Sequence, residues 1–355
     1  MGKKSTSLDM VLIEREDRMD KKFIAGVDIG GTWIRVAICT TDLKIENIKR
    51  KITKTPKKQN FRDTKINKFS ISSSISQLLS NLLSENNITY DQLLGIGIAT
   101  TGQLNLEKGE VINNFYFGFR KIPLKEPIEK SFPGIPFYLI NDCNAAVLGI
   151  HYFEAENNEK DNLFYITMST GIGGGVICNG HLLLGKNGNA AEVGHSLVEP
   201  KGNGTRGSWT TYSSGTGVKI RALNKLNEGK LNAEKLLKIV NFDETMITAK
   251  EIFQAARMGD QLSRKIVDDC VFYTKVGVGL INNCYDCSSI YFGGAMMKDK
   301  DQIIPPICEQ FEKNPIDFTI NTPPKIKVSK YYDEIGLMGA LAFAKYNLEK
   351  NQVVI

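Results

Sequence analysis

Residues 164–195 read FYITMSTGIGGGVICNGHLLLGKNGNAAEVGH, and this stretch predicts how the surrounding chain folds. The apolar run at 163–168 is typical of a buried strand, and a second apolar run follows the glycine-rich segment Ser169–Gly175. Asn179-Gly180 is a strong hairpin signal. We therefore expect a glycine turn between two strands, with hydroxyl groups at its start.

Such a turn is suited to binding a phosphate group. Glycine has no Cβ, so backbone N–H groups in the turn can approach the phosphate closely. Glu192 and His195 follow at a spacing of i, i+3, which places both side chains on one side of a helical turn. A phosphate-binding turn close to this polar pair suggests phosphoryl transfer onto a small polyol.

The same order of elements occurs near residue 30. A short apolar strand at 23–27 leads into DIGGT at Asp28–Thr32, and another strand is expected at 33–39. The repeated pattern suggests an internal duplication, in which two glycine turns clamp the phosphates of a nucleotide. Asp28, at its strand end, is a candidate Mg²⁺ ligand, directly or through water. The alternative is an ordinary tight hairpin, because DxGGT alone is a weak motif.

Three other strand ends carry candidate site residues. Asp142 lies between an expected strand at 137–140 and an alanine-rich helix. This junction is a common place for a catalytic carboxylate. The alternative is that Asp142 is only the N-cap of the helix. Gly102 follows the strand at 93–99, and could approach a ligand or form a simple turn. Gly293-Gly294 follow the strand at 289–292, where glycines would let an adenine ring lie against the backbone; the alternative is a plain strand-to-helix turn.

Composition narrows the class of protein. The chain has 355 residues, 42% of them hydrophobic, which allows two domains with cores of their own. No apolar run is long enough to cross a bilayer, and the charged N-terminus does not resemble a signal peptide. The chain has seven cysteines, and no two CxxC-type spacings occur together as they would in a metal site or a disulfide framework. This pattern indicates free thiols in a reducing compartment, so we expect a cytoplasmic protein.

The lysine-rich segment and the CxxC segment can both be explained without a functional role. The net charge of +6 comes largely from the lysine-rich stretch 44–68. No aromatic or arginine pattern accompanies these lysines, which favours a solvated edge strand and loop over a nucleic-acid surface. The lone CxxC of Cys284 and Cys287 is interpreted as buried thiols near a helix end. An amphipathic helix is expected at 70–85, further helices at 249–258, 261–284 and 335–346, and a last strand at 325–328.

Six motifs, taken together and in order, resemble the ROK family of sugar kinases within the actin-like ATPase superfamily. The resemblance covers about residues 23–344. The motifs are DIGGT at 28–32, LGIGIATTG at 94–102, NDCNAA at 141–146, STGIGGG at 169–175, EVGH at 192–195 and YFGGA at 291–295. Each motif alone is weak, but the ordered set is highly specific.

The resemblance implies a role for each candidate residue. The phosphate loops would be Gly30, Gly31 and Thr32, and Thr170, Gly171 and Gly173, with Gly293 and Gly294 lining the adenosine pocket. The sugar would be bound by Asn141, Asp142, Glu192 and His195, with Gly102 beside them. Asp142 would also be the general base that accepts the proton of the attacked hydroxyl.

The family fold implies an α/β protein of two ribonuclease H-like lobes, with the active site in the cleft between them. A smaller lobe of residues 23–144 and 338–355 and a larger lobe of residues 145–337 would follow a flexible lead-in at 1–22. ATP and Mg²⁺ are the expected cofactors, sugar and nucleotide the expected partners, and a homodimer is expected by family analogy. Neither a nucleic acid nor a membrane is an expected partner.

Two departures from the family pattern bear on the site. No cysteine lies between Cys178 and Cys270, so the family's CxCGxxGC zinc motif is missing, and we expect no structural zinc. Thr210 stands where a sugar-binding glutamate usually precedes the threonine-tyrosine pair, which puts a standard glucokinase specificity in doubt.

The sequence leaves the substrate and two other functions open. Glucose-type hexokinase and N-acetylmannosamine-type kinase fit equally well, both acting on a 6-hydroxyl. A sugar-responsive regulator of the same family would carry a DNA-binding domain in front, and about twenty residues before DIGGT are too few for three helices. A non-catalytic sugar-binding protein is disfavoured by the intact Asp142 and glycine turns.

Overall fold

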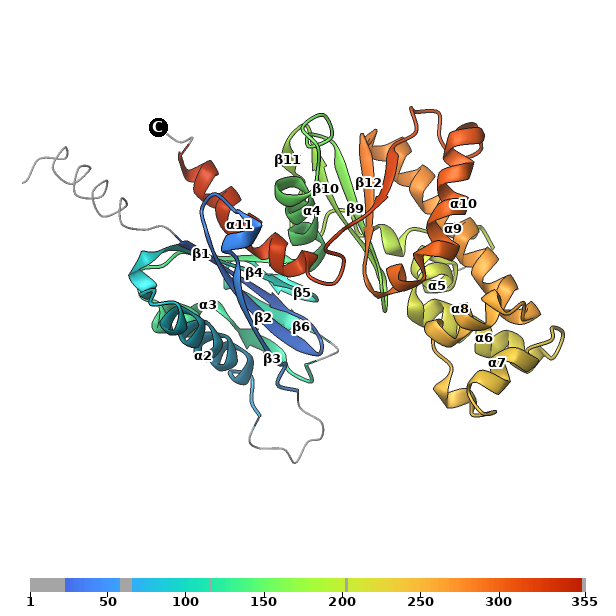
Figure 1. Ribbon diagram of the computed structural model, residues 1–355, viewed down its shortest axis with the longest axis horizontal. Coiled ribbons are helices and arrows are strands. Elements are labelled where there is room, and N and C mark those ends of the chain that lie inside the picture. The colour runs from blue at the N-terminus through green and yellow to red at the C-terminus, as the bar shows by residue number, and fades with distance from the viewer. Residues whose placement is uncertain (1–22, 58–65, 115–116, 202–203, 353–355) are drawn as a thin grey trace, which may run out of the picture. The chain divides into compact units, whose positions relative to one another are not determined.

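The computed structural model describes residues 23–57, 66–114, 117–201 and 204–352 (Figure 1). They form two compact units. The first unit contains the residues up to Phe153 and those from Gly336 onward, and the second is Glu154–Ile335. The N-terminal segment 1–22, expected to be a flexible lead-in, lies outside the described residues.

In the part that the structure describes, the first unit has one five-stranded sheet, a small three-stranded sheet and four α-helices. Its strands are β1 (Phe23–Ile29), β2 (Trp33–Thr40), β3 (Lys49–Lys54), β4 (Leu93–Thr100), β5 (Gln103–Asn105), β6 (Glu110–Asn113), β7 (Arg120–Pro123) and β8 (Phe137–Asn141). Its helices are α2 (Ser70–Glu85), α3 (Lys125–Ser131), α4 (Asp142–Phe153), α11 (Ile335–Gln352) and the short 3-10 helices η1 (Ile45–Asn47) and η2 (Tyr90–Gln92).

The five-stranded sheet has the order β3-β2-β1-β4-β8. β1 pairs antiparallel with β2 and parallel with β4, which in turn pairs parallel with β8. Ile29 lies opposite Thr100, and Thr100 lies opposite Asn141. The carboxyl ends of β1, β4 and β8 therefore meet at one edge of the sheet, as open α/β sheets require for ligand binding.

Helices cover both faces of this sheet (Figure 1). On one face, isoleucines of α2 join the strand core, which includes Val27 and Ile98. The other face has paired glycines, Gly26 opposite Gly97. A Cβ on Gly97 would lie 2.1 Å from the carbonyl oxygen of Ala340, so these glycines let α11 pack directly on the strands.

The division between the units comes after α4, whereas the lobe boundary expected from the sequence precedes most of that helix. Gly339 of α11 explains the difference. A Cβ there would lie 2.0 Å from the carbonyl oxygen of Ala145, so α4 and α11 are in close backbone contact. This packing holds the whole of α4 in the first unit.

The described residues of the second unit form a five-stranded sheet and six α-helices. Its strands are β9 (Leu163–Met168), β10 (Ile172–Cys178), β11 (His181–Leu182), β12 (Ser289–Gly293) and β13 (Lys325–Val328). Its α-helices are α5 (Trp209–Ser213), α6 (Gly215–Glu228), α7 (Glu234–Ile239), α8 (Ala249–Arg257), α9 (Gln261–Tyr285) and α10 (Lys300–Lys313). Its 3-10 helices are η3 (Val193–His195), η4 (Gly204–Gly207), η5 (Glu244–Met246), η6 (Ala295–Asp299) and η7 (Pro315–Asp317).

The second sheet has the order β11-β10-β9-β12-β13. β9 pairs antiparallel with β10 and parallel with β12, and β12 pairs parallel with β13. This arrangement repeats that of the first sheet strand for strand. The repeated strand–turn–strand pattern in the sequence therefore corresponds to one topology used twice.

The hairpin signal in the opening stretch is confirmed. Asn179 and Gly180 have φ angles of 50° and 75°, the left-handed pair that a two-residue hairpin needs, and Cys178 pairs with His181 across the turn. The core of the second unit lies between its sheet and its helices (Figure 1). Trp209, which is fully buried, packs there against Gly277 of α9.

Two further expectations are tested by the fold. All seven cysteines are free, but Cys284 is exposed on the last turn of α9, so the interpretation of a buried pair is wrong for this residue. The lysine-rich stretch does contain an edge strand, β3, while 58–65 lie outside the described residues. Among the helices described, none has the length and apolar character that a bilayer crossing demands.

Candidate active site

The first glycine turn connects β1 to β2 and is closed by a backbone hydrogen bond. Gly30 N–H donates to the carbonyl oxygen of Trp33 at 2.9 Å. Gly31 is partly exposed and Thr32 exposed. The turn predicted from DIGGT is therefore present at the carboxyl end of β1, where its backbone is accessible to a ligand.

Asp28 does not stand alone at this strand end. Arg35 lies directly opposite it on β2, and Arg35 Nη1 donates to Asp28 Oδ2 at 2.9 Å. On its other side, a Cβ built at Gly336 would lie 3.1 Å from Asp28 Oδ1, so the carboxylate lies against the first turn of α11. Burial raises the pKa of Asp28 above its ordinary value, and the charge and hydrogen bond of Arg35 oppose this rise.

Asn141 and Asp142 mark the junction of β8 and α4. The N–H of Cys143 donates to Asn141 Oδ1 and to Asp142 Oδ1, both at 2.9 Å. Both side chains thus help to cap α4, as the alternative interpretation of Asp142 predicts. Both residues are also partly exposed at the sheet edge.

The backbone conformation and the packing at residue 102 both require glycine. Its φ is +106°, and a Cβ there would lie 2.7 Å from the carbonyl oxygen of Asn113. The preceding residue is held by Asn114, whose Nδ2 donates to the Thr101 carbonyl at 2.8 Å. The tight turn accounts for this glycine without a ligand, and it brings Asn114 to the sheet edge that carries Asp142.

The second glycine turn connects β9 to β10 and is closed by Ser169 N–H, which donates to the Gly171 carbonyl at 2.9 Å. The start of α6 holds this turn from one side. Gly215 N–H donates to the Ser169 carbonyl at 2.7 Å and Thr216 N–H to the Thr170 carbonyl at 3.4 Å. A Cβ added at Gly171 would meet nothing within 4 Å, whereas Gly173 is a strand residue paired with Thr167.

A cavity of about 410 Å³ opens beside this turn, within the range of small-molecule sites. It combines hydroxyl groups, small apolar side chains and three lysines. It is lined by Ser169, Thr170, Gly215, Thr216, Lys219, Thr248, Ala249, Lys250, Ala295, Met296, Lys298 and Asp299. Of these, only Thr170 is a candidate from the sequence. Ser169 belongs to the same turn, and the others come from α6, α8 with its N-cap Thr248, and η6, which tertiary packing brings to the strand end.

Gly293 and Gly294 serve close packing of β12 on β9. A Cβ at Gly293 would lie 2.4 Å from the Tyr165 hydroxyl, and one at Gly294 would lie 2.5 Å from the Met168 carbonyl. Gly294 also has a φ of +88°. The two glycines are not among the residues that line the cavity, but the next two residues, Ala295 and Met296, are.

Glu192, His195 and Thr210 are brought together in the second unit. Glu192 occupies the N-cap position of η3 without a side-chain capping bond, His195 is the last residue of η3, and both residues are exposed. A Cβ at Gly194 would lie 2.7 Å from Thr210 Oγ1, which places Thr210 against the middle of this motif. The residue that departs from the family pattern therefore adjoins the expected sugar ligands.

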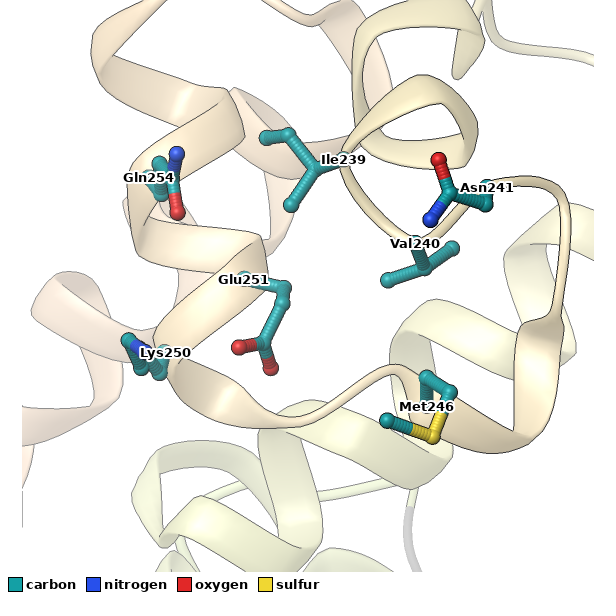
Figure 2. A pocket seen from close by; sticks show the side chains of 7 residues that line it. All are labelled: Ile239, Val240, Asn241, Met246, Lys250, Glu251 and Gln254. Atoms are coloured by element: carbon teal, nitrogen blue, oxygen red, sulfur yellow. The ribbon is translucent and has the colours of Figure 1, made fainter.

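A second cavity of about 340 Å³ lies between α7 and the start of α8. Figure 2 shows the Glu251 carboxylate at its centre, with Ile239, Val240 and Met246 around it. Glu251 Oε2 accepts a hydrogen bond from Thr248 N–H at 3.1 Å and another from the Thr248 hydroxyl. This capping box links the second cavity to the first, because Thr248 lines the larger one.

No group of three or more His, Cys, Asp or Glu side chains in the described part of the chain could hold a metal ion. Asp28 itself offers one carboxylate, which Arg35 already contacts. One carboxylate fits a Mg²⁺ ion that substrate phosphates also ligate, since such ions take one or two protein carboxylates and keep several waters.

The chain is similar to proteins of known family and known structure. The family model described as "ROK family" matches residues 24–347. A glucokinase of Halalkalibacterium halodurans is 31% identical over 299 residues, covering 83% of this chain and 86% of the relative. A ROK family glucokinase from Streptomyces griseus, solved in complex with glucose and AMPPNP, is 26% identical with a TM-score of 0.69, covering 91% of this chain and 99% of the other.

Regulators are also among the relatives. The xylose repressor of Bacillus subtilis is 26% identical over 216 residues, which cover 60% of this chain and 51% of the repressor. The match of the family model over nearly the whole chain, together with the duplicated sheet topology of the actin-like ATPase fold, shows that this protein belongs to the ROK family.

Proposed function

We propose that the protein is an ATP- and Mg²⁺-dependent sugar kinase that phosphorylates the 6-hydroxyl of a hexose or an N-acetylhexosamine. The observation that carries the proposal is the shared edge of the first sheet. The glycine turn after β1 and Asp142 after β8 lie at the same edge, with only β4 between their strands. Two strand spacings of about 4.8 Å separate a phosphate-binding turn from a carboxylate base.

In this proposal Asp142 accepts the proton of the sugar hydroxyl as its oxygen attacks the terminal phosphorus of ATP, and ADP leaves. Asn141, Glu192, His195 and Thr210 bind the other hydroxyls, and Gly102 shapes the turn beside them. Mg²⁺, when bound through Asp28, supplies charge neutralisation of the phosphate oxygens.

The nucleotide would use groups from both glycine turns. Gly30, Gly31 and Thr32 form one phosphate loop, and Thr170, Gly171 and Gly173 belong to the other, beside the 410 Å³ cavity. Ala295 and Met296, which follow Gly293 and Gly294, offer an apolar surface for a base, and the three lysines offer charge for phosphates. Glucokinases among the relatives, one of them with a bound ATP analogue, support this donor.

A direct test combines a substrate screen with one substitution. Purified protein is assayed with ATP and Mg²⁺ on glucose, mannose, fructose, N-acetylglucosamine and N-acetylmannosamine. Asp142→Asn is expected to lower kcat by about 100-fold or more, because a positioned general base contributes at least that much. Asp91→Asn, at an exposed carboxylate in η2, is the matched control. Wild-type turnover by Asp142→Asn would remove Asp142 from the mechanism.

A sugar-responsive regulator is the second candidate, and its support is the similarity to a xylose repressor. Such a protein would bind a sugar without turnover in the screen. Sugar-dependent binding of labelled double-stranded DNA at physiological salt would favour this candidate over the kinase.

We propose that the kinase is a homodimer in the cytoplasm. Sedimentation of the purified protein would test whether it is a dimer.

A further inference from the structure

The first glycine turn is held in shape by a residue from a different strand. Thr55 comes directly after β3, the edge strand, and is 6% exposed. Its hydroxyl donates to the Gly30 carbonyl at 2.7 Å, and its N–H donates to the Thr32 carbonyl at 3.0 Å. One residue therefore engages both ends of the three-residue turn.

These two hydrogen bonds determine which groups the turn presents. A carbonyl oxygen carries partial negative charge, so a turn that binds a phosphate must point N–H groups at it and turn its carbonyls away. Thr55 takes up the carbonyls of Gly30 and Thr32. Among the described residues, the N–H groups of Gly31 and Thr32 donate to no other group of the protein, which leaves both for a ligand.

In the second glycine turn, carbonyl groups are also held by hydrogen bonds, but the donors differ. There the carbonyls of Ser169 and Thr170 accept hydrogen bonds from the start of α6. A helix start supplies its free N–H groups in the second unit. The first unit has no helix at the corresponding place among the described residues, and the side chain of Thr55 supplies one of the two donors instead.

We infer that Thr55 is a positioning residue for nucleotide phosphates: its hydroxyl fixes the Gly30 carbonyl and so orients the N–H groups of the first glycine turn. This inference rests on the proposed function, since it assigns that turn to the donor phosphates. It adds a residue outside the DIGGT motif, and one that touches neither substrate directly.

The variant Thr55→Val tests the hydroxyl alone, because valine has nearly the same shape and keeps the backbone N–H that bonds to Thr32. Two quantities are measured: the affinity for AMPPNP by titration calorimetry, and the KM for ATP with the sugar that the screen identifies. We expect both constants to rise about tenfold, with the KM for sugar changed less than twofold. Thr55→Ser restores the hydroxyl and is expected to return both to within threefold of wild type.

Thr53→Val is the matched control, since it makes the same chemical change two residues earlier on β3, opposite Ile34. It is expected to leave nucleotide affinity unchanged. Thermal unfolding of every variant separates a loss of stability from a loss of affinity. If Thr55→Val does not fold, Thr55→Ala is measured instead, with the same expected rise. A folded Thr55 variant that binds AMPPNP as tightly as wild type overturns the inference.

The two proposals fail in different ways. A wild-type protein that binds AMPPNP but phosphorylates no sugar removes the kinase function and leaves the Thr55 test standing, because the affinity measurement needs no turnover. A wild-type protein that phosphorylates sugar, with nucleotide binding indifferent to Thr55→Val, removes only the role of Thr55. A wild-type protein that binds no nucleotide overturns both.

Discussion

Arg35 and Asp28 face each other across β2 and β1, and the guanidinium donates to the carboxylate at 2.9 Å. Arg35 is 26% exposed and Asp28 13%. The proposed magnesium ligand is therefore already charge-paired at the strand end that leads into the first phosphate loop. Any metal bound there through Asp28 shares the carboxylate with Arg35.

Replacing Arg35 by methionine is expected to destabilise the fold. Burial disfavours the charged form of Asp28, and the variant removes the one charge that offsets this, so its pKa should rise further. The free energy of unfolding should fall by about 1–3 kcal/mol, the usual cost of losing a charged hydrogen-bond partner from a partly buried pair. Urea denaturation at neutral pH measures it.

Lys49→Met, at an exposed position on β3, is the control for the loss of one positive charge. The double variant Asp28→Asn/Arg35→Met should be less destabilised than the sum of its single variants, because no buried charge is then left unpaired. An Arg35→Met protein with wild-type stability would show that the ion pair does not contribute to the free energy of unfolding.

Gly171→Ala separates ligand contact from folding. The added Cβ would meet no protein atom within 4 Å, and the φ of Gly171 lies outside the left-handed region. The thermal stability should therefore be unchanged or slightly higher. If the second turn binds phosphate, the methyl group stands where the ligand approaches, and the KM for ATP should rise about tenfold or more.

Gly294→Ala should show the opposite pattern. Its φ of +88° and the approach of 2.5 Å to the Met168 carbonyl make the added Cβ costly in the protein itself. Strain of this kind costs about 1–3 kcal/mol before the clash is counted. Calorimetric unfolding of both variants, with ATP kinetics in parallel, makes the comparison. Gly171→Ala with unchanged ATP kinetics would exclude this turn from the phosphate site.

Glu251→Ala removes the capping box at the start of α8. Thr248 then loses the acceptor of both its N–H and its hydroxyl, and the first turn of α8, which lines the larger cavity, is released. We expect a loss of about 1 kcal/mol in stability and a rise of a few-fold in the KM for ATP, with kcat little changed. Steady-state kinetics at saturating sugar measures the change.

Glu251→Gln provides the rescue, because glutamine also serves as the third residue of a capping box. Glu234→Ala is the matched control, since it removes a first-turn glutamate from α7 that lines neither cavity. Equal effects of the Glu251 and Glu234 substitutions on the KM for ATP would contradict a special role for the α8 cap.

The local parts of this fold were predictable from the sequence, and its register was not. The strands that the sequence predicts are present, and both glycine turns lie between the predicted strand pairs. The second turn is shorter than predicted, because β10 already begins at Ile172 and Gly173 is paired within it. The roles of Arg35 and Thr55 could not be predicted, because they depend on which residues lie opposite them on other strands. Strand register follows from pairing across the sheet rather than from neighbours along the chain.

The lining of the cavity was missed for a related reason. Lys219, Lys250 and Lys298 come from three separate elements, and each resembles an ordinary surface lysine in its own segment. Only packing of the helices onto the sheet brings them to one strand end. The exposure of Cys284 likewise depends on which side of α9 faces the core, which the weak apolar pattern near that helix end did not decide.

Glu159 predicts how stability depends on pH. Its carboxylate is 1% exposed and accepts hydrogen bonds from Lys327 at 2.8 and 2.9 Å, from Lys325 at 2.9 Å and from the Tyr291 hydroxyl at 3.2 Å. Burial by itself would raise the pKa of Glu159. The hydrogen bonds from the lysines outweigh burial and hold the pKa below the ordinary value of 4.5.

A folded-state pKa below the unfolded one means that the unfolded chain binds the proton more readily. Glu159 thus contributes stability that is fully present above about pH 4.5 and is lost as the pH falls through the folded-state pKa. Glu159→Gln should lower the free energy of unfolding at pH 7 by about 1–3 kcal/mol and flatten its decline below pH 4.5.

Thermal unfolding measured from pH 3 to pH 7 tests this prediction, which uses Glu156→Gln as its control. Glu156 is 66% exposed and lies 3.7 Å from the same Lys327, so its substitution should change stability by less than about 0.5 kcal/mol at any pH. Parallel pH profiles for Glu159→Gln and wild type would mean that the carboxylate titrates alike in the folded and unfolded chain. The contacts of Lys325 and Lys327 with the buried carboxylate would then not be what keeps it charged.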